Sequence, residues 1–118
     1  MSSVAGYRGL PYAAAYCSSK SAISTFAESI FNQCKNLGIT VRVVNPGFIK
    51  TPLTDKNKFD MPMIISSEKA SNIIYKKIVS SNKFEINCPW LFCFFMKILR
   101  ILPYSIYFKL TNYLMKSL

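Results

Sequence analysis

Tyr16 and Lys20 stand four positions apart, and a helix brings side chains at this spacing onto one face. A free phenol has a pKa of about 10, so a tyrosine that exchanges protons near neutral pH needs its anion stabilised. A cation one helical turn away, such as the Lys20 ammonium, provides that stabilisation. Both groups can then meet one substrate. The alternative, that Tyr16 and Lys20 are an ordinary pair on a helix without a catalytic role, stays open when the motif is taken alone.

A second motif, Asn45-Pro46-Gly47, follows a β-branched segment at residues 39–44. Pro46 lacks an amide donor and Gly47 permits unusual backbone angles, so the motif is suited to ending a strand. Open α/β sheets bind ligands at the carboxyl ends of their strands, which is where this turn would lie. A plain strand-ending turn is the alternative reading of Pro-Gly.

The elements that must position these residues follow from the apolar pattern. Residues 1–15 read as a loop, and the helix that carries Tyr16 and Lys20 is expected to end near Gly38. Its apolar positions form a helical stripe predicted to be buried: Ile23, Phe26, Ala27, Ile30, Phe31, Cys34 and Leu37. Residues 39–44 are predicted to be a strand covered on both faces, which gives a βαβ unit with a parallel sheet.

The next segment, residues 50–65, is irregular and is predicted to be a mobile loop over a site. A second helix should follow, capped by Ser66 or Ser67. Four residues are expected on its inner face: Ala70, Ile73, Ile74 and Ile78. A further short strand is expected at residues 83–87.

Fifteen basic residues against five acidic ones give a net charge of +10, which favours anionic partners. No nucleic-acid-binding motif accompanies that charge, so no nucleic-acid partner is expected. The four cysteines form no Cys-x-x-Cys pair and the sequence has no histidine, so no metal site is expected. The start of the chain has no secretory pattern, and we expect reduced thiols in a cytoplasmic setting.

Residues 89–118 form a hydrophobic, basic tail, which we treat as a second segment after residues 1–88. Its longest uncharged stretch, residues 86–96, falls well short of the roughly 18 residues that suggest a spanning helix. Lys97 and Arg100 lie three apart, as on one face of an amphipathic helix, and Pro103 should break that helix. Packing and peripheral membrane contact both remain open as roles for the tail.

The order and spacing of Ser3, Tyr16-x-x-x-Lys20 and Asn45-Pro46-Gly47-x-x-x-Thr51 resemble the classical short-chain dehydrogenase/reductase family. The resemblance runs from residue 2 to about residue 87. It implies an α/β fold, the C-terminal part of a Rossmann-like doubly wound parallel sheet. The cofactor-binding strands and the Gly-rich turn of the family find no counterpart in this sequence, so we expect a truncated chain.

The resemblance also implies the chemistry, an oxidoreductase that uses NAD or NADP to reduce a carbonyl or oxidise an alcohol. Tyr16 would exchange the proton, Ser3 would position the substrate oxygen, and Lys20 would also bind the nicotinamide ribose. The cofactor-binding residues carried over are Tyr16, Lys20, Pro46, Gly47, Ile49 and Thr51. The family's dimers suggest self-association through the helix at residues 16–37.

With few strands in the sequence, we expect the isolated chain to be marginally stable, oligomeric or adsorbed to a membrane. The alternative to an enzyme is a noncatalytic module that acts at a membrane surface or on a protein partner, in which Tyr16 and Lys20 are vestiges.

Overall fold

The computed structural model describes residues 1–57 and 60–116. The elements in chain order are η1 (Val4–Gly6), α1 (Ala14–Asn36), β1 (Val43–Pro46), β2 (Ile49–Lys50), η2 (Thr54–Lys56), β3 (Ile65–Ser66), α2 (Ser67–Ser80), β4 (Glu85–Cys88), α3 (Trp90–Ile101) and α4 (Tyr104–Lys116). β1 pairs in parallel with β4, and β2 pairs in parallel with β3. The fold is therefore α/β with parallel strands, as predicted.

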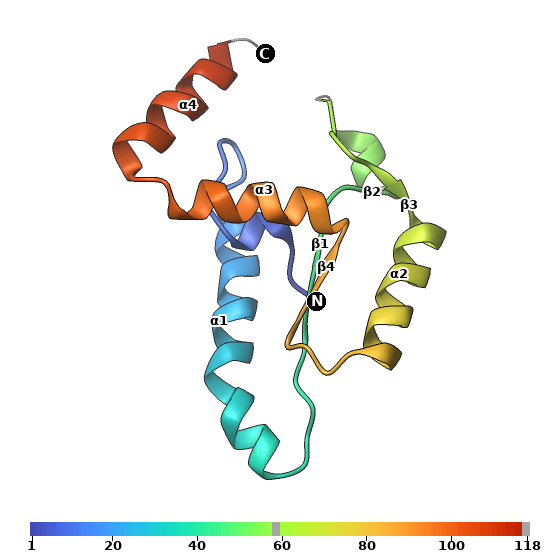
Figure 1. Ribbon diagram of the computed structural model, residues 1–118. Coiled ribbons are helices and arrows are strands. Elements are labelled where there is room, and N and C mark those ends of the chain that lie inside the picture. Colours follow the sequence, from blue (N-terminus) through green and yellow to red (C-terminus); the bar gives the residue numbers. More distant parts are fainter. Residues whose placement is uncertain (58–59, 117–118) are drawn as a thin grey trace.

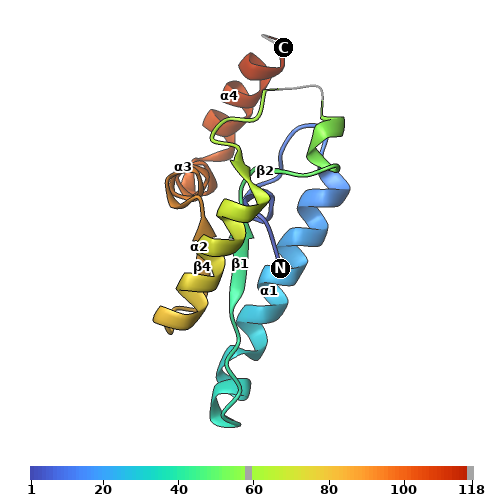
Figure 2. The same cartoon turned by 90° about the vertical axis from the view of Figure 1, so that its right-hand side faces the viewer.

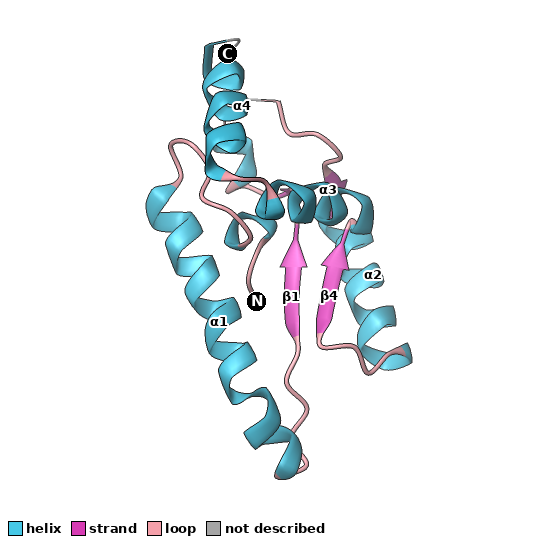
Figure 3. Ribbon diagram, turned by 60° about the vertical axis from the view of Figure 1, so that its left-hand side comes forward, coloured by secondary structure: helices cyan, strands magenta, loops and turns pink. Residues whose placement is uncertain are grey.

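The helices surround the β1–β4 pair on three sides. α1 and α2 lie on opposite sides of it, as Figures 1 and 2 both show. α3 crosses the carboxyl ends of the two strands, and α4 continues away from them (Figure 3). The chain thus places a helix directly over the end of the sheet where parallel sheets bind ligands.

The ends of the first two long helices follow the local chemistry of the sequence. α1 ends where Gly38 adopts a φ of +73°, a left-handed conformation that favours glycine. The Gly38 amide donates to the Lys35 carbonyl at 3.0 Å. α2 begins after Ser66, whose Oγ accepts a hydrogen bond from the Lys69 amide at 3.2 Å. Both predicted boundaries are confirmed.

The predicted strand at residues 39–44 is wrong in its position. The strand is Val43–Pro46, because pairing starts where Val43 lies opposite Glu85 and ends where Pro46 lies opposite Cys88. Asn45 and Pro46 therefore belong to the strand, and Gly47 is the first residue beyond it. The last predicted strand is likewise shifted and runs from Glu85 to Cys88.

The predicted loop at residues 50–65 is more regular than its composition suggests. It begins at the end of β2, contains η2, and ends in β3, which lies beside β2. Residues 58 and 59 of this segment lie outside the described residues, and its predicted mobility stays a prediction.

The predicted buried stripe on α1 is only partly buried, since Ile30, Phe31 and Cys34 are half-buried and Ile23 is exposed. Phe26 is 66% exposed and Leu37 75%, whereas Ala27 and Cys17 are buried. α1 packs chiefly against η1 and much less against the sheet, so most of its apolar face has no element to cover it among the described residues. On α2 the predicted inner face holds for Ala70 but not for Ile78, which is exposed near the free end of the helix.

The core lies between η1 and α3. Val4, Cys93 and Met96 form a buried cluster, with Tyr7 and Phe92 among the residues packed around it. The first turn of the chain and the tail helix therefore share one core. The division of the chain at residues 88 and 89 stays a prediction.

Candidate functional site

Tyr16 and Lys20 lie in the first two turns of α1, with their side chains on one face. The Lys20 ammonium is 5.5 Å from the centroid of the Tyr16 ring, within the range of a cation–π contact. Tyr16 is 48% exposed, so its phenol is open to a molecule that approaches from solvent. The helix thus places an acid–base group and a cation side by side, as the spacing predicts.

Ser3 is buried and lies next to the Pro-Gly turn. Its Oγ accepts a hydrogen bond from the Ala5 amide at 3.2 Å, which caps η1, and donates to the Pro46 carbonyl at 3.4 Å. The second bond is close to the upper limit for a hydroxyl donor and is therefore weak.

Ser2 joins the Ser3 segment to the helical turn that carries Lys20. The Ser2 Oγ donates to the Lys20 carbonyl at 2.8 Å and accepts from Ser24 at the same distance, while the Ser2 amide donates to the Val44 carbonyl at 2.9 Å. The Lys20 Nζ reaches the Met1 carbonyl at 3.5 Å. Residues 1–3 thus link the Lys20 turn of α1 to β1.

Gly6 completes this attachment by close approach. A Cβ added at Gly6 would lie 3.0 Å from the Lys20 carbonyl carbon, a tight contact, so glycine favours the close approach of η1 to α1. The sequence reading missed both Ser2 and Gly6. The only sign of their role in the sequence is the Ser2-Ser3 pair followed by Gly6 three residues later.

At the Pro-Gly turn, Gly47 is in contact with α3. The Gly47 amide donates to the Cys88 carbonyl at 2.8 Å, and a Cβ on Gly47 would lie 2.7 Å from Phe92 Cδ1. Glycine is therefore required here by packing against the tail helix, whatever else approaches the turn.

Ile49 and Thr51 lie beyond the turn and are engaged with η2. The Ile49 carbonyl accepts from Thr54 Oγ1 at 2.7 Å, and the Thr51 amide donates to the same hydroxyl at 2.9 Å. These backbone groups of Ile49 and Thr51 are thus engaged in local hydrogen bonds, as the Gly47 amide is with Cys88.

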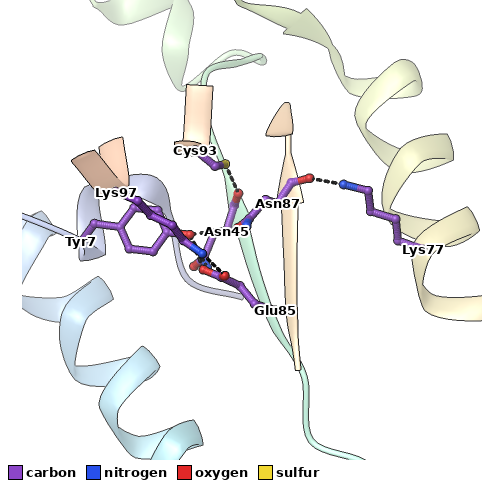
Figure 4. A network of polar contacts seen from close by, with 7 residues as sticks. All are labelled: Tyr7, Asn45, Lys77, Glu85, Asn87, Cys93 and Lys97. Carbon is purple, nitrogen blue, oxygen red and sulfur yellow. Dashed lines mark hydrogen bonds and ion pairs between the residues drawn. The ribbon is translucent and has the colours of Figure 1, made fainter. Parts of the chain in front are cut away.

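A polar network that the sequence reading missed lies beneath α3 (Figure 4). Glu85 forms an ion pair with Lys97 and accepts hydrogen bonds from the Tyr7 hydroxyl and, at 2.9 Å, from Asn45 Nδ2. The Tyr7 hydroxyl also contacts Asn87 Oδ1 at 2.9 Å. The sequence offers one sign of this network: Glu85 is the only acidic residue after Glu68, in a segment rich in basic residues.

Two backbone contacts extend this network on either side. Cys93 Sγ donates to the Asn45 carbonyl at 3.3 Å, and Lys77 of α2 donates to the Asn87 carbonyl at 2.5 Å (Figure 4). Asn45 Oδ1 is buried without a hydrogen-bond partner in the described part of the chain, and Asn45 lines a cavity of about 170 Å³ between α1, the sheet and α3.

The ionisation of the network follows from burial and charge. Burial alone would raise the pKa of Glu85, but the hydrogen bonds from Lys97, Tyr7 and Asn87 together lower it below the ordinary carboxyl value. Burial raises the pKa of the Tyr7 phenol, and Glu85 raises it further. Burial also raises the pKa of the Cys93 thiol to about 11. Glu85 is thus ionised and Tyr7 protonated at neutral pH, so the network is a fixed support for α3.

Comparison with known proteins adds a family to this geometry. The family model described as short chain dehydrogenase matches residues 1–61, a range that holds the Tyr-x-x-x-Lys pair, the Pro-Gly turn and the segment with Ser3.

Three curated relatives illustrate the range of similarity. An uncharacterized oxidoreductase of Myxococcus xanthus is 37% identical over 103 residues, 87% of this chain and 40% of the relative. A 3-oxoacyl-[acyl-carrier-protein] reductase FabG of Rickettsia prowazekii is 43% identical over 56 residues, 48% of this chain and 23% of the relative. A 3beta-hydroxysteroid dehydrogenase of Mediterraneibacter gnavus is 41% identical over 61 residues, 52% of this chain and 22% of the relative. The chain spans about two fifths or less of the length of these relatives.

Proposed function

This chain belongs to the short-chain dehydrogenase family, and we propose that it carries the acid–base residues and the nicotinamide-facing residues of an NAD(P)-dependent oxidoreductase. The observation that supports this most directly is the attachment of the Ser3 segment to the helical turn of Lys20. It joins Met1 and Ser2, the residues just before Ser3, to the turn of α1 that carries Lys20.

The residues present suit one end of the cofactor and not the other. The Tyr16 and Lys20 face is open to solvent and lies beside the segment that contacts Pro46, so it could take the nicotinamide and its ribose. Lys20 would hold the ribose, and the backbone at Pro46 and Gly47 would lie along the ring, with Ile49 and Thr51 at its carboxamide. The 118 residues contain no Gly-rich turn to hold the pyrophosphate.

In the proposed reaction Tyr16 transfers the proton. Its hydroxyl gives a proton to the carbonyl oxygen in reduction, or takes one from the alcohol in oxidation. The Lys20 charge favours the phenolate that remains, and the Ser3 hydroxyl orients the substrate oxygen by exchanging its weak bond to Pro46. When bound, the cofactor supplies or accepts the hydride.

The substrate we propose is a small carbonyl compound or alcohol. Relatives named for acyl-carrier-protein and steroid substrates differ widely, so the comparisons favour no one substrate class. Either NAD or NADP fits the proposal.

Self-association through the exposed apolar side of α1 belongs to the same proposal. Phe26 and Leu37 expose large apolar surfaces on this helix, and burying them between two copies would be favourable. Sedimentation velocity should show a dimer that Phe26→Ser converts to a monomer. A chain that is monomeric before the substitution would contradict this part.

Titration of NADH and NADPH into the purified chain, followed by nicotinamide fluorescence, tests the cofactor proposal. Lys20→Gln should weaken binding about tenfold, the effect of losing one favourable charged contact. Tyr16→Phe should keep the binding and remove turnover of a small ketone or aldehyde. Tyr12→Phe is the matched control, because Tyr12 is 93% exposed in the preceding turn.

Two results would contradict the proposal. Turnover retained in Tyr16→Phe would remove the proton-transfer role, and a wild-type chain that binds neither nucleotide would remove the cofactor site from this chain.

A further inference from the structure

α3 has two apolar faces. Its inner face packs in the core, and its outer face is exposed. Cys93 and Met96 point inward and are buried. The residues that expose more than a third of their surface on the same helix include six large apolar side chains: Trp90, Leu91, Phe94, Phe95, Ile98 and Ile101. A contiguous exposed apolar surface of this kind marks an interaction site, so the outer face of α3 is a surface that lacks its partner.

α4 is amphipathic and also has a wide exposed apolar face. Its polar residues Ser105, Lys109, Asn112 and Lys116 fall on one narrow face at helical spacing. Apart from Thr111, the other residues of the helix are apolar or aromatic, and Tyr104, Ile106, Phe108 and Tyr113 are exposed.

α4 is anchored to the body of the protein at its first turn. Tyr107 is buried and its hydroxyl donates to the Gly9 carbonyl at 2.5 Å. The Arg8 guanidinium lies 4.5 Å from the Tyr104 ring centroid and 4.4 Å from that of Tyr107. These contacts fix the start of α4 and leave its later turns projecting beyond the sheet, as Figure 1 shows.

The charge of this region has one sign. Arg100, Lys109 and Lys116 are basic and no acidic residue follows Glu85, while Lys97 is paired with Glu85 beneath α3. The whole chain carries +10. A second copy of the chain would bring like charges together at this surface, whereas an anionic lipid surface would neutralise them.

From these observations we propose that α3 and α4 dock on an anionic lipid surface, with the outer aromatic residues of α3 in the interface and the lysines of α4 against the headgroups. Aromatic and aliphatic residues on one side of a helix with lysines beside them are typical of helices that lie in the membrane plane. Among the described residues, none of the helices has the length and hydropathy of a membrane span. The docking that we propose is peripheral. The proposal does not depend on the oxidoreductase assignment.

Trp90 makes the proposal directly measurable. It is the only tryptophan of the chain and lies on the outer face of α3, 66% exposed. On addition of vesicles of phosphatidylcholine with phosphatidylglycerol, its emission should shift to shorter wavelength, and the chain should float with the vesicles in a density gradient. Vesicles of phosphatidylcholine alone should give a much weaker response.

Substitutions at the surface are preferable to removal of the tail, because Cys93 and Met96 belong to the core. Phe94→Ser should weaken vesicle binding about tenfold, as expected when one aromatic side chain leaves an apolar interface. Replacing both Lys109 and Lys116 by Gln should weaken it roughly fivefold per lysine, and only for anionic vesicles. Val79→Ser, on the exposed side of α2, is the matched control and should bind as the wild type does.

Three results would overturn the proposal. The first is equal binding to neutral and anionic vesicles with no effect of the lysine substitutions. The second is full binding by Phe94→Ser. The third is a blue shift of Trp90 that grows with protein concentration without lipid and is lost in Phe94→Ser, because a second copy would then be the partner of this face.

Discussion

Replacing Glu85 by Gln should destabilise the packing of α3 on the sheet while leaving the shape of the side chain unchanged. Glu85 receives hydrogen bonds from Tyr7, which follows η1, from Asn45 of β1 and from Lys97 of α3. Hydrogen bonds to a charged group contribute about 1.5 to 3 kcal/mol net. The Lys97 side chain is 42% exposed and is hydrated again when its partner is lost. The contribution of its ion pair to stability is therefore at the low end of this range.

We therefore expect Glu85→Gln to lower the free energy of unfolding by about 2 kcal/mol. In a chain of this length such a loss lowers Tm by roughly 8 °C. The measurement is thermal unfolding followed by circular dichroism at neutral pH. Glu28→Gln is the control, since Glu28 is exposed on α1 and should leave Tm nearly unchanged.

The same variant should change the response to acid. The pKa of Glu85 is lowered in the folded chain, so its contribution to stability is complete above the ordinary carboxyl pKa and is lost as the pH falls through the lowered value. Glu85→Gln should remove that part of the acid destabilisation. If wild type and variant have the same Tm at neutral pH, or lose stability in parallel on acidification, the network does not hold α3 in place.

Three further substitutions test separate parts of the fold by the same unfolding measurement. Gly47→Ala should cost about 1 to 3 kcal/mol, because its Cβ would overlap Phe92, whereas Gly9→Ala has open space and should be nearly neutral; equal effects would refute the contact. Gly38→Ala should cost about 1 kcal/mol because of its left-handed φ, and an unchanged stability would mean that α1 ends differently. Ser66→Ala should cost about 1 kcal/mol through loss of the cap of α2, and no loss would remove Ser66 as the cap.

The parts of the fold that the sequence predicts correctly are those set by nearby residues. Gly38 ends α1, Ser66 caps α2, and Pro103 separates α3 from α4 through chemistry that acts within one helical turn. Tyr16 and Lys20 share a face for the same reason.

Features that depend on distant partners were not predictable from the sequence. The position of β1 is set by its register with β4, which begins where Val43 faces Glu85, and the β-branched residues before it gave no sign of this. The apolar period of α1 identified a face but not what would cover it, and Phe26 remained exposed. The network around Glu85 joins three elements that only the tertiary fold brings together.

The contact of Phe92 with Gly47 joins the helix proposed to meet lipid to the turn proposed to lie along the nicotinamide. Two ligands that each change this contact are thermodynamically linked. If membrane binding changes the affinity of the chain for the nucleotide by some factor, nucleotide binding changes its affinity for the membrane by the same factor. The lipid surface would in that case act as an effector of the chemistry as well as a location for it.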